Sequence, residues 1–450
     1  MGKELFGTDG IRGVAGEYPL DAVTVHALGM ALGSDACRTA GNPEILIGMD
    51  TRESSPWIAA QVAGGLRRRG VRVRSAGVIT TPGVAYLTRT GPFCAGVMIS
   101  ASHNPYQDNG IKVFGHSGFK LPDDEEHAIE QEIFRLRDEG VEPEALEPAL
   151  DAGLDQQYLG YLVSTMPARL TGLRMVVDCG NGAACQLAPD LFSRLGAEVT
   201  SINREPSGRN INLDCGALHV EGLRRKVLDE GADCGVAFDG DADRAIFIAR
   251  SGKIVDGDAV LLVAGRALKA AGHLPGNVVV STVMSNLGLE KALEREGIRM
   301  LRTPVGDKYV LEEMVRSGAM LGGEQSGHVI FREWSTTGDG LLTALRVFEV
   351  AARAQAGLDE LTADLAIYPQ RLVNVRVREK RPLDEIPAVT AEIRRFREAF
   401  GDAGRVVVRF SGTEPLARVM VEGPDLARVE DATARIAGAI ERELGSSKGA

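Results

Sequence analysis

The 450-residue sequence is poor in cysteine and has no long apolar run. No Cys-x-x-Cys pair occurs among its six cysteines, which argues against a disulfide framework or a zinc site and favours buried thiols in a reducing compartment. No apolar run approaches the roughly 18 residues of a membrane span, and the first residues lack the apolar stretch of a secretory signal. We therefore expect a cytoplasmic protein with no membrane partner.

Basic residues are also in the minority, with 51 Lys and Arg against 62 Asp and Glu and a formal net charge of −11. A nucleic-acid partner is not expected, because its phosphates need a clustered basic surface. The sequence has no Gly-x-x-x-x-Gly-Lys-Ser/Thr loop, which excludes ATP hydrolysis by that route. The one Gly-x-Ser-x-Gly match, at 445–449, lies in a polar tail and does not indicate a hydrolase.

A unit of strand, helix, strand, helix and strand is present three times. In each unit a helix ends near a glycine and a short strand follows, at 66–73, 191–199 and 293–300. An apolar strand precedes each of these stretches, at 44–50, 173–178 and 278–283. A further strand follows each, at 94–99, 234–238 and 318–321. This alternation predicts parallel strands with helices on both faces of the sheet.

The C-terminal part has a different pattern, in which 371–379 and 405–410 alternate as half-exposed strands and 426–444 has helical periodicity. We therefore expect three similar α/β domains with mixed, mostly parallel sheets, and a C-terminal α+β domain, around a central cleft. The predicted boundaries are 1–153, 154–254, 255–368 and 369–450. A polar loop follows the last strand of each α/β unit, where ligands gather in open α/β sheets; these loops are 100–105, 239–244 and 322–328.

The loop after the second of these strands contains Asp239, Asp241 and Asp243, separated only by Gly240 and Ala242. Three closely spaced carboxylates can bind one hard cation, and the open positions that remain suit Mg²⁺ awaiting a phosphate oxygen. A calcium loop does not fit, because the glycine and glutamate it needs are both replaced by arginine. The alternative is a solvated acidic turn without function. Arg244, the next residue, suits a phosphate group.

The loop at 100–105 contains Ser102 and His103 before an Asn-Pro turn. Its hydroxyls could simply satisfy the backbone of the turn. However, a small hydroxyl at a strand end, near Lys112 and opposite a Mg²⁺ site, is a candidate acceptor and donor of a phosphoryl group.

Two further loops are candidates for substrate binding. Glu324, Ser326 and His328 offer polar groups for adjacent sugar hydroxyls, although a histidine near a turn is often only structural. In the fourth domain, consecutive hydroxyls and backbone N–H groups between two arginines would form an anion site for a second phosphate. The residues of this second loop are Arg409, Ser411, Gly412, Thr413 and Arg418. The alternative for it is a hairpin turn with surface arginines.

These segments, in this order and together with Phe6-Gly-Thr-Asp-Gly-Ile-Arg-Gly at 6–13, resemble the α-D-phosphohexomutases over essentially the whole chain. The resemblance implies that Ser102 is phosphorylated and that Mg²⁺ bridges this phosphate to the three aspartates. It places Arg12 and Lys112 beside the phosphoserine. It assigns the loop at 322–328 to the sugar and the loop at 409–415 to the distal phosphate.

Gln325 favours the amino-sugar branch of the family. The implied reaction interconverts glucosamine 6-phosphate and glucosamine 1-phosphate through a 1,6-bisphosphate, for UDP-N-acetylglucosamine and cell-wall precursors. Glucosamine 1,6-bisphosphate or glucose 1,6-bisphosphate would be the activator. Lys112 or His103 would move the hydroxyl proton, and the sequence does not decide between them. The alternatives are a phosphomannomutase or phosphoglucomutase, a Mg²⁺-dependent sugar phosphatase and a non-catalytic sugar-phosphate sensor. Whether the chain forms a homodimer is left open.

Overall fold

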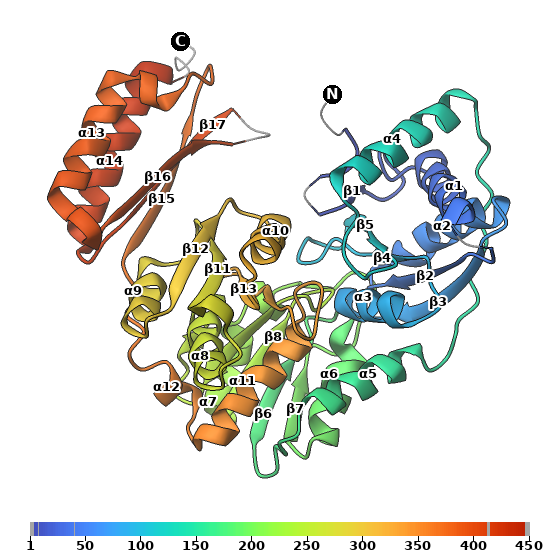
Figure 1. The fold of residues 1–450 in the computed structure, drawn as a ribbon, viewed down its shortest axis with the longest axis horizontal. Coiled ribbons are helices and arrows are strands. Elements are labelled where there is room, and N and C mark those ends of the chain that lie inside the picture. The colour runs from blue at the N-terminus through green and yellow to red at the C-terminus, as the bar shows by residue number, and fades with distance from the viewer. Residues whose placement is uncertain (1–3, 8, 40, 412–414, 446–450) are drawn as a thin grey trace. The chain divides into compact units, whose positions relative to one another are not determined.

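The computed structural model describes all residues except 1–3, 8, 40, 412–414 and 446–450 (Figure 1). Contacts divide the chain into two compact units. The first contains Met1–Thr282 and Leu301–Ala363, and the second contains Val283–Met300 and Asp364–Ala450. The four domain boundaries expected from the sequence stay a prediction.

The first sheet has the strand order β1-β5-β4-β2-β3. Strand β2 runs parallel to β3 and β4, whereas β5 is antiparallel to both β4 and β1. The sheet therefore combines a parallel core with an antiparallel edge. Its strands are β1 (Ile11–Val14), β2 (Glu44–Met49), β3 (Arg72–Val78), β4 (Ala95–Ile99) and β5 (Asp108–Gly115).

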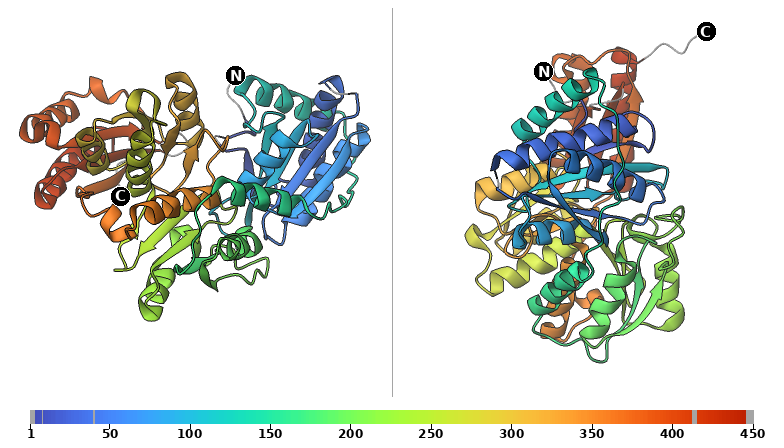
Figure 2. Two further views of the ribbon diagram at one scale, coloured as in Figure 1. Left: turned by 60° about the horizontal axis from the view of Figure 1, so that its bottom comes forward. Right: turned by 90° about the vertical axis from the view of Figure 1, so that its right-hand side faces the viewer.

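Helices cover both faces of this sheet (Figure 2). Because side chains alternate along a strand, Ile45 and Ile47 of β2 join the core under α1, α2 and α4, while Gly48 faces α3. Helices α1 and α2 pack so closely that a Cβ on Gly65 would lie 2.2 Å from the carbonyl oxygen of His26. The helices are α1 (Ala22–Thr39), α2 (Ser55–Arg68), α3 (Thr81–Thr90) and α4 (Asp123–Asp138).

The second sheet repeats this arrangement in the order β10-β9-β8-β6-β7. Strand β6 is parallel to β7 and β8, and β9 is antiparallel to β8 and β10. Its strands are β6 (Arg174–Asp178), β7 (Glu198–Ile202), β8 (Cys234–Phe238), β9 (Ala245–Ala249) and β10 (Ile254–Val255). Its helices are α5 (Leu154–Thr165), α6 (Ala184–Arg194) and α7 (Glu221–Glu230).

The third sheet has four strands in the order β12-β11-β13-β14. Strand β13 begins later than the sequence predicts, because Gly318 takes a left-handed conformation with φ 77° and ends the preceding helix. The strands are β11 (Val278–Thr282), β12 (Arg299–Thr303), β13 (Leu321–Gly323) and β14 (Val329–Phe331). The helices of this part of the first unit are α8 (Gly257–Ala270), α10 (Asp307–Ser317), α11 (Gly340–Ala354) and α12 (Leu358–Leu361).

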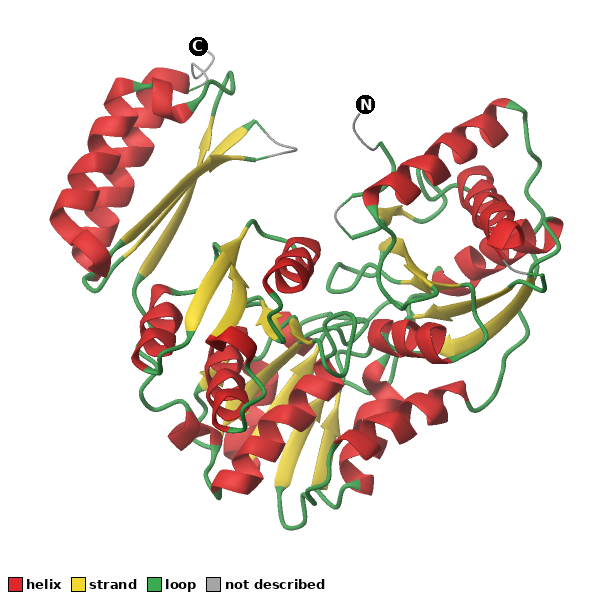
Figure 3. Ribbon diagram, viewed as in Figure 1, coloured by secondary structure: helices red, strands yellow, loops and turns green. Residues whose placement is uncertain are grey.

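The second unit contains the antiparallel sheet β15-β17-β16, with α13 and α14 packed against one face (Figure 3). The predicted ranges 405–410 and 426–444 match β16 and α14. Helix α9 contacts this sheet at its first residue, where Leu287 N donates a hydrogen bond to Oε1 of Glu422 on β17 at 2.8 Å. The elements are α9 (Leu287–Arg295), β15 (Gln370–Arg376), α13 (Pro387–Phe400), β16 (Arg405–Phe410), β17 (Leu416–Glu422) and α14 (Leu426–Leu444).

Strands β4, β8 and β13 occupy the same topological position in their sheets. Each lies between one parallel neighbour and one antiparallel neighbour. The three polar loops predicted from the sequence leave the carboxyl ends of these strands. The fold class expected from the sequence, three related α/β domains and a C-terminal α+β domain, is confirmed. Among the described residues, none of the helices has the length and apolar character needed to cross a membrane.

Candidate active site

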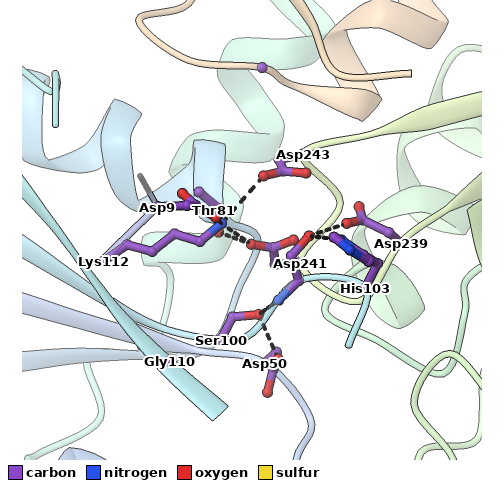
Figure 4. A network of polar contacts seen from close by, with 12 residues as sticks. Asp9, Asp50, Thr81, Ser100, His103, Gly110, Lys112, Asp239, Asp241 and Asp243 are labelled. Carbon is purple, nitrogen blue, oxygen red and sulfur yellow. Dashed lines mark hydrogen bonds and ion pairs between the residues drawn. The ribbon is translucent and has the colours of Figure 1, made fainter. Parts of the chain in front are cut away.

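The loops that follow β4 and β8 meet at Ser102. Its hydroxyl donates a hydrogen bond to Asp239 Oδ2 at 2.5 Å, and its side chain is buried. The Ser102 backbone has a left-handed φ of 52°, which is uncommon for a residue with a side chain. The Ser102 N–H donates to Ser100 Oγ, which holds the backbone in this conformation. Ser100 in turn donates to the buried Asp50 (Figure 4). The sequence-predicted hydroxyl and the first predicted metal ligand are therefore in contact.

The three aspartates form a compact group of carboxylates. One oxygen from each of Asp239, Asp241 and Asp243 lies within 4.8 Å of the others, and all three side chains are buried. Asp241 Oδ1 and Asp243 Oδ1 have no hydrogen-bond partner among the described residues. A solvated acidic turn is therefore the wrong interpretation. Buried carboxylate oxygens without donors fit a hard divalent cation, so the residues present match the predicted metal site.

The electrostatics of the group also match a cation site. Burial, together with the neighbouring charges of Asp243 and Asp241, raises the pKa of Asp239 well above its usual value. Burial acts in the same direction on Asp243, but Lys112 and His328 lower the pKa of this carboxyl overall. A bound divalent cation would offset the repulsion among the three carboxylates.

Lys112 projects from β5 into this group of carboxylates (Figure 4). Its Nζ lies 2.9 Å from Asp241 Oδ2, 3.4 Å from Asp243 Oδ2 and 3.1 Å from Asp9 Oδ2. Burial acts to lower the pKa of Lys112, but these three carboxylates raise it well above the usual value. Lys112 is therefore a fixed positive charge. Arg12 on β1 pairs with Asp9 and approaches Asn104 Oδ1 at 3.5 Å.

His103 lies beside the serine hydroxyl, with its Nδ1 3.4 Å from Ser102 Oγ. Burial, followed by the positive charges of Arg244 and Arg12, lowers the pKa of His103 to about 4. The two predicted proton carriers therefore differ in charge at neutral pH: Lys112 is protonated and His103 is neutral.

A cavity of about 410 Å³ opens beside these residues and lies entirely within the first unit. Its walls come from all three α/β parts of the unit. Arg244 adds a backbone N–H that donates to Asp239 Oδ1 at 3.2 Å. The sequence-predicted residues that line the cavity are Arg12, His103, Asp243, Arg244, Glu324 and His328.

Two residues of the third loop, Gln325 and Ser326, do not line this cavity. The hydroxyl of Ser326 donates to Glu324 Oε2 at 3.4 Å, and Ser326 is not among the residues that line this cavity. The side chain of Gln325 is hydrogen-bonded to Asp256, the N-cap of α8. Gln325 is also not among the lining residues. The residue that favoured the amino-sugar branch thus contacts a helix terminus instead of this cavity.

His328 connects the third loop to the aspartates. Burial lowers its pKa, but Asp243 and other carboxylates raise the pKa to about 9. The N–H of Gly338, however, donates to Nε2 at 3.1 Å, a contact that only an unprotonated Nε2 can accept. This hydrogen bond fixes a neutral ring with its proton on Nδ1, which lies 3.6 Å from Asp243 Oδ2.

The predicted distal phosphate loop lies in the second unit. Arg409 on β16 and Arg418 on β17 are direct cross-strand partners. Ser411 follows β16, and its N–H donates to Leu416 O at 2.8 Å. Gly412 and Thr413 fall outside the described residues. The described part of the loop thus places two arginines next to each other on adjacent strands.

Sequence reasoning missed Arg52, whose side chain is fully buried. Its Nε donates to Asp50 Oδ2 at 2.8 Å, and its terminal nitrogens donate to backbone carbonyls of the serine loop, residues 100–105, and of the first residue of β5. These carbonyls belong to Ser102, Asn104, Pro105 and Asp108. The available signal was an Asp-Thr-Arg sequence at the end of a predicted strand. Four other residues of the site were also missed, namely Asp9, Thr81, Asn212 and Asp307.

Profiles of one protein family match successive parts of the chain. Four profiles of the phosphoglucomutase/phosphomannomutase family match it in order. They are alpha/beta/alpha domain I at residues 3–139, domain II at 156–252, domain III at 256–368 and the C-terminal domain at 372–439.

Solved structures of the same fold include a phosphoglucomutase/phosphomannomutase family protein from Burkholderia thailandensis. It has a TM-score of 0.79 and 24% identity and covers 97% of both chains. An N-acetylphosphoglucosamine mutase from Aspergillus fumigatus, solved with GlcNAc-6P and magnesium, has a TM-score of 0.67 and 20% identity. That match covers 98% of this chain and 96% of the other. At these identities the likeness shows the fold.

Closer relatives share most of the sequence. A phosphoglucosamine mutase from Solibacter usitatus is 70% identical over 99% of this chain and 100% of its own length. A second, from Koribacter versatilis, is 53% identical over 98% of both chains. With the four family profiles and the shared fold, these matches show that the chain belongs to the phosphoglucomutase/phosphomannomutase family of isomerases and, within it, to the phosphoglucosamine mutases.

Proposed function

We propose that the protein interconverts glucosamine 6-phosphate and glucosamine 1-phosphate through a phosphorylated Ser102 and a 1,6-bisphosphate intermediate. The observation that carries this proposal is the contact between Ser102 Oγ and Asp239 Oδ2, which sets a buried hydroxyl against a cluster of cation ligands. Lys112 supplies a positive charge 2.9 Å from Asp241 Oδ2 in the same cluster, and the relatives are named for this activity.

Mg²⁺ is the cation that we propose for Asp239, Asp241, Asp243 and the phosphate on Ser102. The donor set consists of oxygens, and two of them lack any other partner among the described residues. When bound, the ion would neutralise charge on the phosphoryl group during transfer. The Aspergillus relative was solved with magnesium, which agrees with this assignment.

The transfer begins when the free hydroxyl of the sugar phosphate attacks the phosphorus on Ser102. The bond from phosphorus to Ser102 Oγ breaks and a bond to the sugar oxygen forms. Of the two predicted proton carriers, the neutral His103 takes up the hydroxyl proton and passes it to Ser102 Oγ, whereas the protonated Lys112 supplies positive charge. The bisphosphate then turns over, and its other phosphoryl group returns to Ser102. Arg12, Lys112 and Arg244 stabilise the charge that develops on the phosphoryl oxygens.

We assign the remaining predicted residues to holding the substrate. Glu324 and His328 face the cavity and would bind sugar hydroxyls, with Ser326 supporting Glu324. The distal phosphate would be bound in either orientation by the loop of the C-terminal domain. The residues of this loop are Arg409, Ser411, Gly412, Thr413 and Arg418.

A mechanism of this kind needs an activator, because loss of the bisphosphate leaves Ser102 without its phosphoryl group. We propose glucosamine 1,6-bisphosphate or glucose 1,6-bisphosphate for this role. We also propose a cytoplasmic location, which is consistent with the free thiols of five described cysteines, and a product used for UDP-N-acetylglucosamine and cell-wall precursors. A homodimer and the domain boundaries 1–153, 154–254, 255–368 and 369–450 stay predictions.

Kinetic comparison of three hexose phosphates tests the proposed substrate. We expect kcat/KM for glucosamine 6-phosphate to exceed the values for glucose 6-phosphate and mannose 6-phosphate by about 10- to 100-fold, because a binding site discriminates only modestly between substituents of nearly the same size. A preference for glucose or mannose phosphate would assign the chain to the corresponding mutase activity. Stoichiometric release of inorganic phosphate would indicate a phosphatase, and binding without turnover would indicate a sensor.

A further inference from the structure

The position of the Asp241 carboxylate is set by a residue far away in the sequence. Thr81 Oγ1 donates to Asp241 Oδ2 at 2.5 Å, and the Thr81 N–H donates to the Asp241 carbonyl at 3.0 Å. Thr81 is the first residue of α3 and is buried. It is itself held in place, because Thr80 caps the helix by accepting a hydrogen bond from Gly83 N.

These contacts give the two oxygens of Asp241 different roles. Oδ2 accepts from Thr81 Oγ1 and lies 2.9 Å from Lys112 Nζ (Figure 4). Oδ1 is buried and has no hydrogen-bond partner among the described residues. Because Oδ2 is occupied, the carboxylate cannot rotate without losing both contacts. Oδ1 is therefore the atom that remains available as a ligand.

A second hydrogen bond links the first and second α/β parts of the first unit, and here the donor lies in the second part. Asn212, which follows β7 in the second α/β part, donates through Nδ2 to the Ser102 carbonyl at 2.9 Å. The serine loop is thus held from the second part, while the aspartate loop is held by Thr81 from the first part. Each loop depends on the other part of the unit for its position.

We propose that Thr81 is a positioning residue for the cation site. Thr81 orients Asp241, so that the site is complete only when the start of α3 contacts the aspartate loop, residues 239–244. This inference rests on the cation site of the proposed function. Residues that hydrogen-bond a metal ligand commonly alter metal affinity by about 10- to 100-fold when they are removed. The same order of effect is expected here.

The test measures cation binding directly, by calorimetric titration of Mn²⁺ and of Mg²⁺ into the purified full-length chain. In Thr81→Val, which keeps the shape and removes the hydroxyl, we expect the dissociation constant to rise by about 10- to 100-fold. In Thr81→Ser, which keeps the hydroxyl, the constant should stay within about threefold of wild type. Thr88→Val is the matched control, because Thr88 is a buried threonine of the same helix whose hydroxyl donates only to Val84 O.

The outcomes separate this inference from the proposed function. Wild-type affinity in Thr81→Val, or an equal loss in Thr88→Val, would overturn the positioning role while leaving the cation site intact. If wild-type protein binds neither cation, or if Asp241→Asn leaves binding unchanged, the cation site itself is wrong and the inference fails with it. Melting temperatures of the metal-free variants show whether each one is folded.

Discussion

Replacement of Ser102 with alanine is expected to lower mutase turnover by about 10⁴-fold or more, because the covalent route then has no acceptor. The change removes one oxygen from a buried loop whose backbone contacts to Ser100, Arg52 and Asn212 do not involve the hydroxyl. Folding and binding of glucosamine 6-phosphate should therefore persist. Steady-state turnover and ligand titration of the same preparation measure both effects.

The control for this variant is Ser164→Ala, which removes an exposed hydroxyl from α5 that donates only to the carbonyl of Tyr161. It should turn over substrate at the wild-type rate. Turnover by Ser102→Ala above roughly one hundredth of wild type would contradict a covalent mechanism through this residue.

Replacement of Arg52 with methionine is expected to have the largest effect on stability. Methionine keeps much of the apolar volume but leaves the buried Asp50 without its cationic partner. Three carbonyls of the serine loop and the carbonyl of Asp108 also lose a donor. Removing one partner of a buried ion pair typically costs about 3–5 kcal/mol. We therefore expect a clearly lower midpoint of thermal unfolding, together with a large loss of kcat because Ser102 is no longer held against Asp239.

Arg52→Lys should recover only part of the loss, because an ammonium group cannot donate in the planar fork that reaches both Asp50 and the loop. Arg209→Met is the matched control, since Arg209 forms an exposed pair with Glu53 and its removal should change the midpoint little. A wild-type midpoint and wild-type kcat in Arg52→Met would show that Arg52 does not organise the loop.

Features encoded over a few residues could be predicted from the sequence. The carboxylates of Asp239, Asp241 and Asp243 lie together in space because the three residues are neighbours in the sequence. The alternation at 405–410 and the helical periodicity at 426–444 define an edge strand and a helix. The common position of the three loops followed from the repeated unit, because β4, β8 and β13 have equivalent neighbours.

Features that depend on long-range contacts could not be predicted. The hydrogen bonds from Arg52 end on backbone carbonyls about 50 positions away, and carbonyls carry no sequence signal. Thr81 and Asp241 are separated by 160 positions. The side chain of Gln325 reaches Asp256 because α8 begins beside the third loop, a packing detail that the motif alone does not contain.

Transfer of a labelled phosphoryl group tests the central claim most directly. The protein is loaded at Ser102 with a radiolabelled phosphoryl group from glucose 1,6-bisphosphate, freed of excess ligand, and mixed with Mg²⁺ and unlabelled glucosamine 6-phosphate. Our account predicts that the label leaves Ser102 and appears first in glucosamine 1,6-bisphosphate and then in the hexosamine monophosphates. Label that stays on the protein while glucosamine 1-phosphate forms, or that appears only as inorganic phosphate, would contradict it.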